Sequence, residues 1–254
     1  MSSFVIKIIA CVTMILDHIK YAIPQTENVL TIYLGRTSYP LFAFLLVEGY
    51  IHTSDLKKYY KRLFIFAIIS QIPFMLFRTL VGEWKMLNIM FTLLLGLLSI
   101  TAYDKIKKEY ISFPICLLLI LLGNFVNVDY GWFGVSTILI LYIFRKSKTL
   151  KSLGYTILVV FYFYMMNANF TNINTIKVLL AYLIPLIPIV MYNGKQGKKI
   201  KHFFYWFYPI HMAIVYGISF LFIWNKQVTL WFTCYFCKYN CLKNYVDCDI
   251  IYKQ

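Results

Sequence analysis

Long runs of apolar residues follow one another along almost the whole chain, and short polar or basic stretches separate them. Each run approaches the length that a helix needs to cross the hydrocarbon core of a bilayer. Since backbone polar groups cannot stay unpaired in lipid, the pattern predicts an all-α, polytopic transmembrane helical bundle. We predict about nine spans, at residues 4–23, 37–53, 63–77, 86–103, 111–127, 131–144, 153–167, 176–192 and 203–224.

Lys and Arg residues gather in the stretches that follow every second span, at 57–62, 104–109, 145–151 and 194–201. Basic loops stay on the cytoplasmic side of a membrane, so these four loops and the N-terminus should be cytoplasmic. The opposite loops have no Lys or Arg within 24–28, 123–129 and 167–175, and are predicted to face outward.

The composition supports a membrane protein, because 61% of the 254 residues are hydrophobic and only 14% are charged. A soluble domain carries roughly a quarter charged residues. The net charge of +15 would suggest nucleic acid as a partner of a soluble protein. Here the basic residues fall between spans, where topology explains them, so we expect a lipid bilayer and no nucleic acid as partner.

The pattern divides the chain into a transmembrane domain, residues 1–224, and an atypical tail, residues 225–254. The tail is rich in cysteine but lacks the paired spacing that is typical of zinc sites, so a neutral tail is favoured and no metal is expected. The first apolar run is not read as a cleavable signal peptide, because no small-residue cleavage site precedes Asp17 and His18. The four tail cysteines are Cys234, Cys237, Cys241 and Cys248.

Several ionisable residues fall inside the predicted spans, where a charge costs on the order of 3 kcal/mol even on a mild insertion scale. Asp17 and His18 lie about two-thirds of the way along the first span, toward the outer half of the membrane. Arg36 opens the second span on the same side, so an Asp17–Arg36 ion pair explains Asp17 as well as a role in chemistry does. Asp129, at the outer mouth of the sixth span, can join this outer set or simply cap a helix.

Two further groups lie deeper in the membrane and at its inner side. Tyr208 and His211 are three residues apart and share a helix face, and Pro209 between them frees a backbone carbonyl. Glu48 and His52 are spaced i and i+4, so they share a face at the inner end of the second span and can hydrogen-bond. A packed core histidine and interfacial snorkelling are the alternative explanations for His211 and His52.

This column of acids and histidines fits two classes of protein. One is a membrane transporter or proton relay, in which the groups pass a proton or an ion across. The other is an intramembrane transferase, in which a charged cytoplasmic donor meets an acceptor from elsewhere. No phosphate-binding Gly-rich loop, metalloprotease histidine pair or serine-nucleophile elbow is present in the sequence.

Five segments resemble, in order and in spacing, the TraX family of bacterial membrane proteins. The resemblance covers most of residues 5–220 and is most specific at Gly35–Thr53 and Tyr208–His211. The segments are "KIIACVTMILDHI" (7–19), "LGRTSYPLFAFLLVEGYIHT" (34–53), "YYKRLFIFAIISQIPF" (59–74), "DYGWFGV" (129–135) and "FFYWFYPIHM" (203–212).

The family is named for the protein that acetylates the N-terminus of F-type conjugative pilin, and it is similar to integral membrane acyltransferases that use acetyl-CoA. The resemblance therefore implies a multi-pass acetyltransferase of the bacterial cytoplasmic membrane. Asp17 and His18 match the Asp-His motif of the family, which implies that they belong to a reaction centre. The acceptor is then a pilin, another small membrane peptide or a sugar.

As a mechanism we hypothesise that His18, or else His211, is the general base, and that Arg36 or Tyr208 holds the oxyanion. Asp17 points about 100° away from His18 on a helix, so it is expected to fix Arg36. Glu48 and His52 are expected to shape the inner entrance for the donor. The basic clusters would hold the phosphates of acetyl-CoA, through Lys57, Lys58, Lys198, Lys199 and Lys201.

Overall fold

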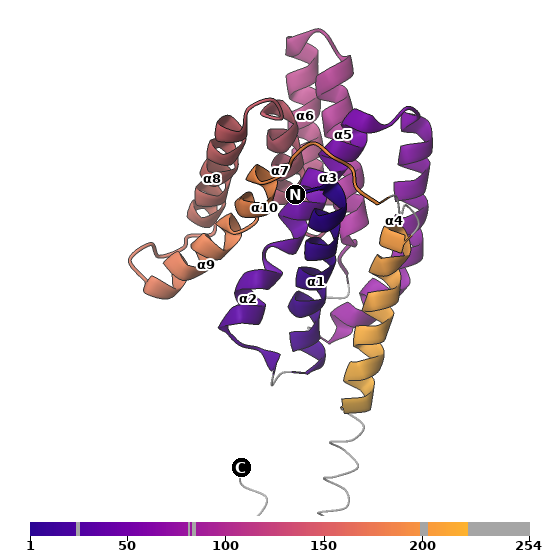
Figure 1. Cartoon of the computed structure of the whole chain (residues 1–254), viewed down its shortest axis with the longest axis vertical. Helices are drawn as coiled ribbons and strands as arrows, with labels where there is room; N and C mark the ends of the chain where they lie inside the picture. The colour runs from indigo at the N-terminus through magenta and orange to yellow at the C-terminus, as the bar shows by residue number, and fades with distance from the viewer. Residues whose placement is uncertain (24–25, 81, 83–84, 199–202, 223–254) are drawn as a thin grey trace, which may run out of the picture.

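A computed structural model of the chain describes residues 1–23, 26–80, 82, 85–198 and 203–222. Its described part is a helical bundle with no strand beyond one isolated bridge, which confirms the all-helical prediction (Figure 1). The helices are α1 (Ser3–Ala22), α2 (Val29–Gly35), α3 (Ser38–His52), α4 (Leu56–Thr79), α5 (Ile89–Lys105), α6 (Glu109–Phe125), α7 (Gly131–Ile143), α8 (Lys148–Met165), α9 (Ile173–Leu183), α10 (Leu186–Val190) and the 203–222 helix (Phe203–Phe222).

Each predicted span coincides with helix, but the structure adds one short helix, lengthens a second helix and divides a third. The extra helix α2 starts at a capping box, in which the side chain of Asn28 accepts from the backbone of Thr31 and that of Thr31 accepts in return. Helix α4 begins seven residues before the predicted span, because the side chain of Asp55 caps it by accepting from the backbone N–H of Lys58. The predicted span 176–192 is divided into α9 and α10, with Pro185 as the N-cap of α10.

Helices α3 and α7 form the centre of the bundle. Helix α3 packs against α1, α5 and α7, and its Tyr39, Leu41 and Phe44 are at most 1% exposed. Helix α7 packs against α5, α6 and α8 as well as α3. At one crossing a Cβ added to Gly96 of α5 would overlap the side chain of Ile138, so glycine lets α5 and α7 approach closely.

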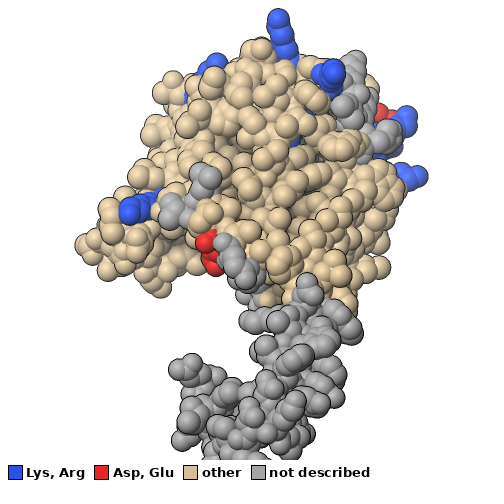
Figure 2. All heavy atoms as spheres, turned by 60° about the horizontal axis from the view of Figure 1, so that its bottom comes forward, with Lys and Arg blue, Asp and Glu red and all other residues tan. Residues whose placement is uncertain are grey.

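Large apolar side chains are also exposed on the outside of the bundle. Ile72 of α4 and Phe113 of α6 are 70% and 72% exposed. A folded chain with this much apolar surface suits a bilayer better than water. Figure 2 shows one end of the molecule, where uncharged residues cover most of the face and Lys and Arg lie toward its rim.

Three helical stretches in the described part are long and apolar enough to cross a bilayer: Leu56–Thr79, Ile173–Val190 and Phe203–Phe222. Glu109–Phe125 and Gly131–Ile143 are shorter apolar helices. A membrane environment is therefore supported. The count of nine spans and the cytoplasmic N-terminus stay predictions, and the predicted tail 225–254 lies outside the described residues.

The 203–222 helix lies beside α4 and near α1, although it is far from both in sequence (Figure 1). Its Tyr205 and Trp206 rings pack on Phe66 of α4, with ring centres 5.1 and 5.2 Å apart. Lys7 of α1 lies over the Phe204 ring at 5.1 Å. This packing brings the far end of the transmembrane region against the first helix.

Tyrosine hydrogen bonds to Asp104 join three helices at one end of the bundle. The Tyr50 hydroxyl of α3 donates to Asp104 Oδ2 at 2.8 Å, and the Tyr142 hydroxyl of α7 donates to Oδ1 at 2.6 Å. The two rings meet edge to face at 5.3 Å, and Arg145 lies over the Tyr142 ring at 4.0 Å. A single carboxylate at the end of α5 therefore connects α3 and α7.

We predict that Tyr50→Phe and Tyr142→Phe each lower the stability of the protein in detergent. Each variant removes one hydrogen bond to a carboxylate, which should cost roughly 1–2 kcal/mol. When either tyrosine substitution is combined with Asp104→Asn, the loss in free energy of unfolding should be smaller than the sum of the two single losses. Both hydrogen bonds end on the Asp104 carboxylate, so its replacement already weakens them. Thermal unfolding of the variants checks this, with the exposed Lys107→Gln as control; full additivity would contradict the shared carboxylate.

Candidate functional site

Two histidines from opposite ends of the transmembrane region meet in the bundle. His18 lies near the end of α1 and His211 lies on the 203–222 helix, and His18 Nδ1 is 3.0 Å from His211 Nε2. The two rings are nearly parallel, at 19°, with their centres 5.1 Å apart. The structure thus brings together the two residues that the sequence offered as alternative bases.

The partners of these rings determine which nitrogen carries a proton. His211 Nδ1 lies 2.9 Å from the carbonyl oxygen of Phe207, which can only accept, so Nδ1 must carry the hydrogen. In a neutral ring His211 Nε2 is then an acceptor, and His18 Nδ1 must donate to it. His18 Nε2 is consequently the nitrogen that is left with a free lone pair.

Aromatic side chains surround both rings. His18 meets the edge of Phe77 at 4.9 Å, and His211 stacks on Phe207 at 4.7 Å. The Tyr208 ring centre is 5.4 Å from that of His211, and Tyr208 is buried. An uncompensated charge is costly in such surroundings, so the hydrogen bonds of the pair determine the state of both rings.

Asp17 pairs with a residue that sequence reasoning did not identify. Its Oδ1 is 2.7 Å from Lys20 Nζ one helical turn away, and both side chains are largely buried. The expected pair with Arg36 is therefore wrong for the described conformation, because the nearer lysine at i+3 takes the carboxylate. A Cβ on Gly35 would overlap the Asp17 carboxylate, so the end of α2 packs directly on it.

Arg36 faces a different part of the molecule. Its guanidinium lies over the ring of Tyr182 of α9, 6.0 Å from the ring centre. Its Nε is buried and, within the described part of the chain, has no hydrogen-bond partner. Helix α2 packs against α9, which explains why the residue that ends α2 is directed there.

Asp129 reaches the same region from the loop before α7. Its backbone N–H donates to the carbonyl of Leu87 at 2.9 Å, and its own carbonyl accepts from the Thr92 hydroxyl. Its carboxylate interacts electrostatically with Arg78, Asp17 and Arg36. The outer set that the sequence predicted is thus close enough to interact.

Arg78 is the second functional candidate that sequence reasoning missed. It lies near the end of α4 and interacts electrostatically with His18, Asp129 and Tyr208. Two signals could have identified the missed cations. Lys20 is three residues after Asp17, and Arg78 lies between a predicted span and the next one on the side that is otherwise poor in basic residues.

The inner candidates, Glu48 and His52, lie in the last turns of α3. His52 Nδ1 is 3.8 Å from the Glu48 carboxylate and 2.9 Å from the Glu48 carbonyl, so these two side chains are neighbours as predicted. Lys151 of α8 is buried, lies over Phe44 at 5.1 Å and interacts electrostatically with Glu48. The Ser3 hydroxyl donates to the Tyr192 hydroxyl, and Tyr192 also interacts with Glu48, so this inner group lies near the start of α1, about 22 Å along the helix from His18.

The lysines proposed for the donor are exposed wherever the structure describes them. Lys57 and Lys58 lie in the first turn of α4, and Lys58 Nζ is 3.0 Å from Asp55. Lys198 follows a segment that hydrogen-bonds to the first residues of α1, through Lys195 and Gln196. Lys199 and Lys201 lie outside the described residues.

No metal-binding cluster is found in the described ranges, where groups of three or more His, Cys, Asp or Glu residues with suitable proximity do not occur. The four tail cysteines, on which the weighed zinc site depended, are outside those ranges. The tail therefore stays untested as a metal site.

Comparison with known proteins identifies the family to which the chain belongs. The family model described as "TraX protein" matches residues 2–219. A curated relative, the probable fimbrial assembly protein FimC, serogroup H1, of Dichelobacter nodosus, is 30% identical over 169 residues, which is 60% of this chain and 67% of the relative. No solved structure matches. Since the family model extends across the His18–His211 pair and nearly all the described helices, the chain belongs to the TraX family.

Proposed function

We propose that this protein is a membrane-embedded acetyltransferase that moves an acetyl group from acetyl-CoA to an amine or hydroxyl of an acceptor. The observation that carries the proposal is the buried His18–His211 pair, because it leaves one basic nitrogen, His18 Nε2, without a hydrogen. General bases in acyl transfer need such a nitrogen. The family membership and the Asp-His motif support the same chemistry.

In the proposed reaction the acceptor nitrogen or oxygen attacks the thioester carbonyl, and His18 Nε2 takes the proton of the attacking group. The tetrahedral intermediate then expels the CoA thiolate, and His18 returns the proton to the sulfur. The ring is positively charged between these steps. Asp17 attracts that charge, whereas Lys20 and Arg78 oppose it, and Nδ1–H stays bonded to His211.

The oxyanion of the intermediate needs a donor near the histidine pair. Of the two residues offered by the sequence, Tyr208 lies beside His211, whereas Arg36 lies over Tyr182. We therefore assign the donor role to Tyr208, with the positive charge of Arg78 nearby. Arg36 is not used in this mechanism.

The donor is proposed to enter from the side of the basic loops, with its phosphates at Lys57, Lys58 and Lys198 and its flexible pantetheine arm directed toward His18. Glu48 and His52 lie at that end of α3 and would shape the entrance. The acceptor is proposed to be a pilin-like peptide or a glycan. The name of the Dichelobacter relative, a probable fimbrial assembly protein, favours the peptide.

The first test supplies the purified protein with acetyl-CoA that is labelled in the acetyl group. We expect label to appear on a co-purified or added peptide, with an equal amount of CoA released. The runner-up function, a transporter or proton relay, predicts proton or ion flux into liposomes without acetyl-CoA. Flux of that kind, together with no transfer and no release of CoA, would contradict the proposal.

The second test separates the two histidines. His18→Gln should insert and fold but lose roughly 10²–10⁴-fold in turnover, which is the usual contribution of a general base. His211→Gln should lose less than His211→Leu, because a glutamine amide oxygen can still accept from His18 Nδ1. Turnover is measured on variants whose detergent melting temperatures match that of the wild type.

Near-normal turnover of His18→Gln would show that another group is the base. Equal losses of turnover for His211→Gln and His211→Leu would show that His211 does not position His18 by accepting its hydrogen bond. Equal losses of turnover in His18→Gln and His211→Gln would indicate that the two rings act together as the base.

A further inference from the structure

Arg36 carries a half-buried charge that the proposed mechanism does not use. Among the described residues no ion pair involves it, and Asp17, one of the two carboxylates that interact with it electrostatically, is already paired with Lys20. The Tyr182 ring accepts one face of the guanidinium, but a ring does not satisfy the buried Nε, which has no hydrogen-bond partner among the described residues. A half-buried guanidinium with an unpaired Nε is a place where an anion can bind.

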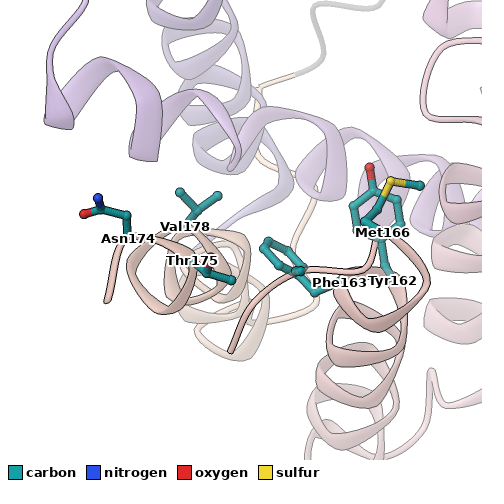
Figure 3. A pocket seen from close by; sticks show the side chains of 7 residues that line it. Tyr162, Phe163, Met166, Asn174, Thr175 and Val178 are labelled. Atoms are coloured by element: carbon teal, nitrogen blue, oxygen red, sulfur yellow. The ribbon is translucent and has the colours of Figure 1, made fainter. Parts of the chain in front are cut away.

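An apolar pocket is lined in part by the aromatic rings that pack on Tyr182. It has a volume of about 350 Å³, which is within the range of small-molecule sites. Figure 3 shows it between the end of α8 and the start of α9, with Tyr162, Phe163 and Met166 on one side and Val178 on the other. Its remaining lining residues are Ala168, Asn174 and Thr175.

Tyr182 connects the cation to the pocket. The Phe163 ring centre is 5.4 Å from that of Tyr182, and the Tyr162 ring centre is 6.1 Å away. Arg36 lies over the same Tyr182 ring at 6.0 Å. The Tyr182 ring therefore packs both against the guanidinium and against two of the rings that line the pocket.

We infer that this site binds an anionic phospholipid of the bilayer, with its phosphate at Arg36 and one acyl chain in the α8–α9 pocket. Guanidinium groups match phosphate oxygens in charge and in fork geometry. The pocket supplies the apolar surface that a chain needs, and exposed Met166, Ile173 and Leu180 surround its helices with lipid-compatible side chains. A soluble anion would leave this apolar surface unused.

The inference does not depend on acetyl transfer, so its failure would leave the proposed function untouched. It is tested by native mass spectrometry of the purified full chain with added phosphatidylglycerol. Arg36→Gln should weaken binding roughly tenfold, because the charge-assisted bonds to phosphate are lost. Val178→Trp fills the pocket and should weaken binding to a similar extent.

Two control variants carry matched changes outside the site. Lys177→Gln removes an exposed cation from the same helix, and Leu180→Trp adds the same bulk at an exposed position. Both should bind the lipid as the wild type does. Diacylglycerol, which has the chains but no phosphate, should bind at least tenfold more weakly than phosphatidylglycerol.

Equal weakening by Arg36→Gln and Lys177→Gln would overturn the inference, because it would indicate general charge attraction. Competition by glycerol phosphate as strong as that by the lipid would also overturn it in favour of a free phosphate. Displacement by an acidic acceptor peptide, and not by lipid, would assign the site to a peptide instead. If Arg36→Gln does not fold, the comparison of Val178→Trp with Leu180→Trp decides the question.

Discussion

The hydrogen bond between His18 and His211 is the constraint on which the proposed chemistry depends. It joins the first helix to the 203–222 helix beside the aromatic rings of Phe77 and Phe207. The Phe207 carbonyl fixes the direction of the bond, because a carbonyl can only accept. Any displacement of the 203–222 helix from α1 and α4 would break this hydrogen bond, and the position of the hydrogen on the His18 ring would no longer be fixed.

Other charged groups lie around this pair. Lys20 neutralises Asp17, which lets a carboxylate remain buried and still act on His18 at longer range. Asp129 and Arg78 interact with each other, and they come from the loop before α7 and from the last turn of α4. Arg36 forms no ion pair among the described residues and lies over Tyr182, whose ring packs on two rings that line the α8–α9 pocket, and we propose a separate, lipid-binding role for it.

The sequence predicted the helices well because apolar runs determine them, and it singled out His18 and His211, which the structure brings together. It could not predict which groups meet. His18 and His211 are 193 positions apart in the sequence, so their contact depends on how their two helices pack. It also chose Arg36 as the partner of Asp17, although an i, i+3 lysine on the same helix was nearer. The division of α9 from α10 was readable from Pro185, but α2 required recognition of the Asn28–Thr31 capping box.

The most direct measurement is the ¹⁵N chemical shift of the ring nitrogens of His18, in protein labelled at histidine and held in detergent near neutral pH. Variants at His18 and His211 assign the signals. The account predicts a protonated Nδ1 and an unprotonated Nε2 in His18, with the same pattern in His211. A proton on His18 Nε2 and none on Nδ1 would reverse the hydrogen bond and contradict the assignment of His18 Nε2 as the base.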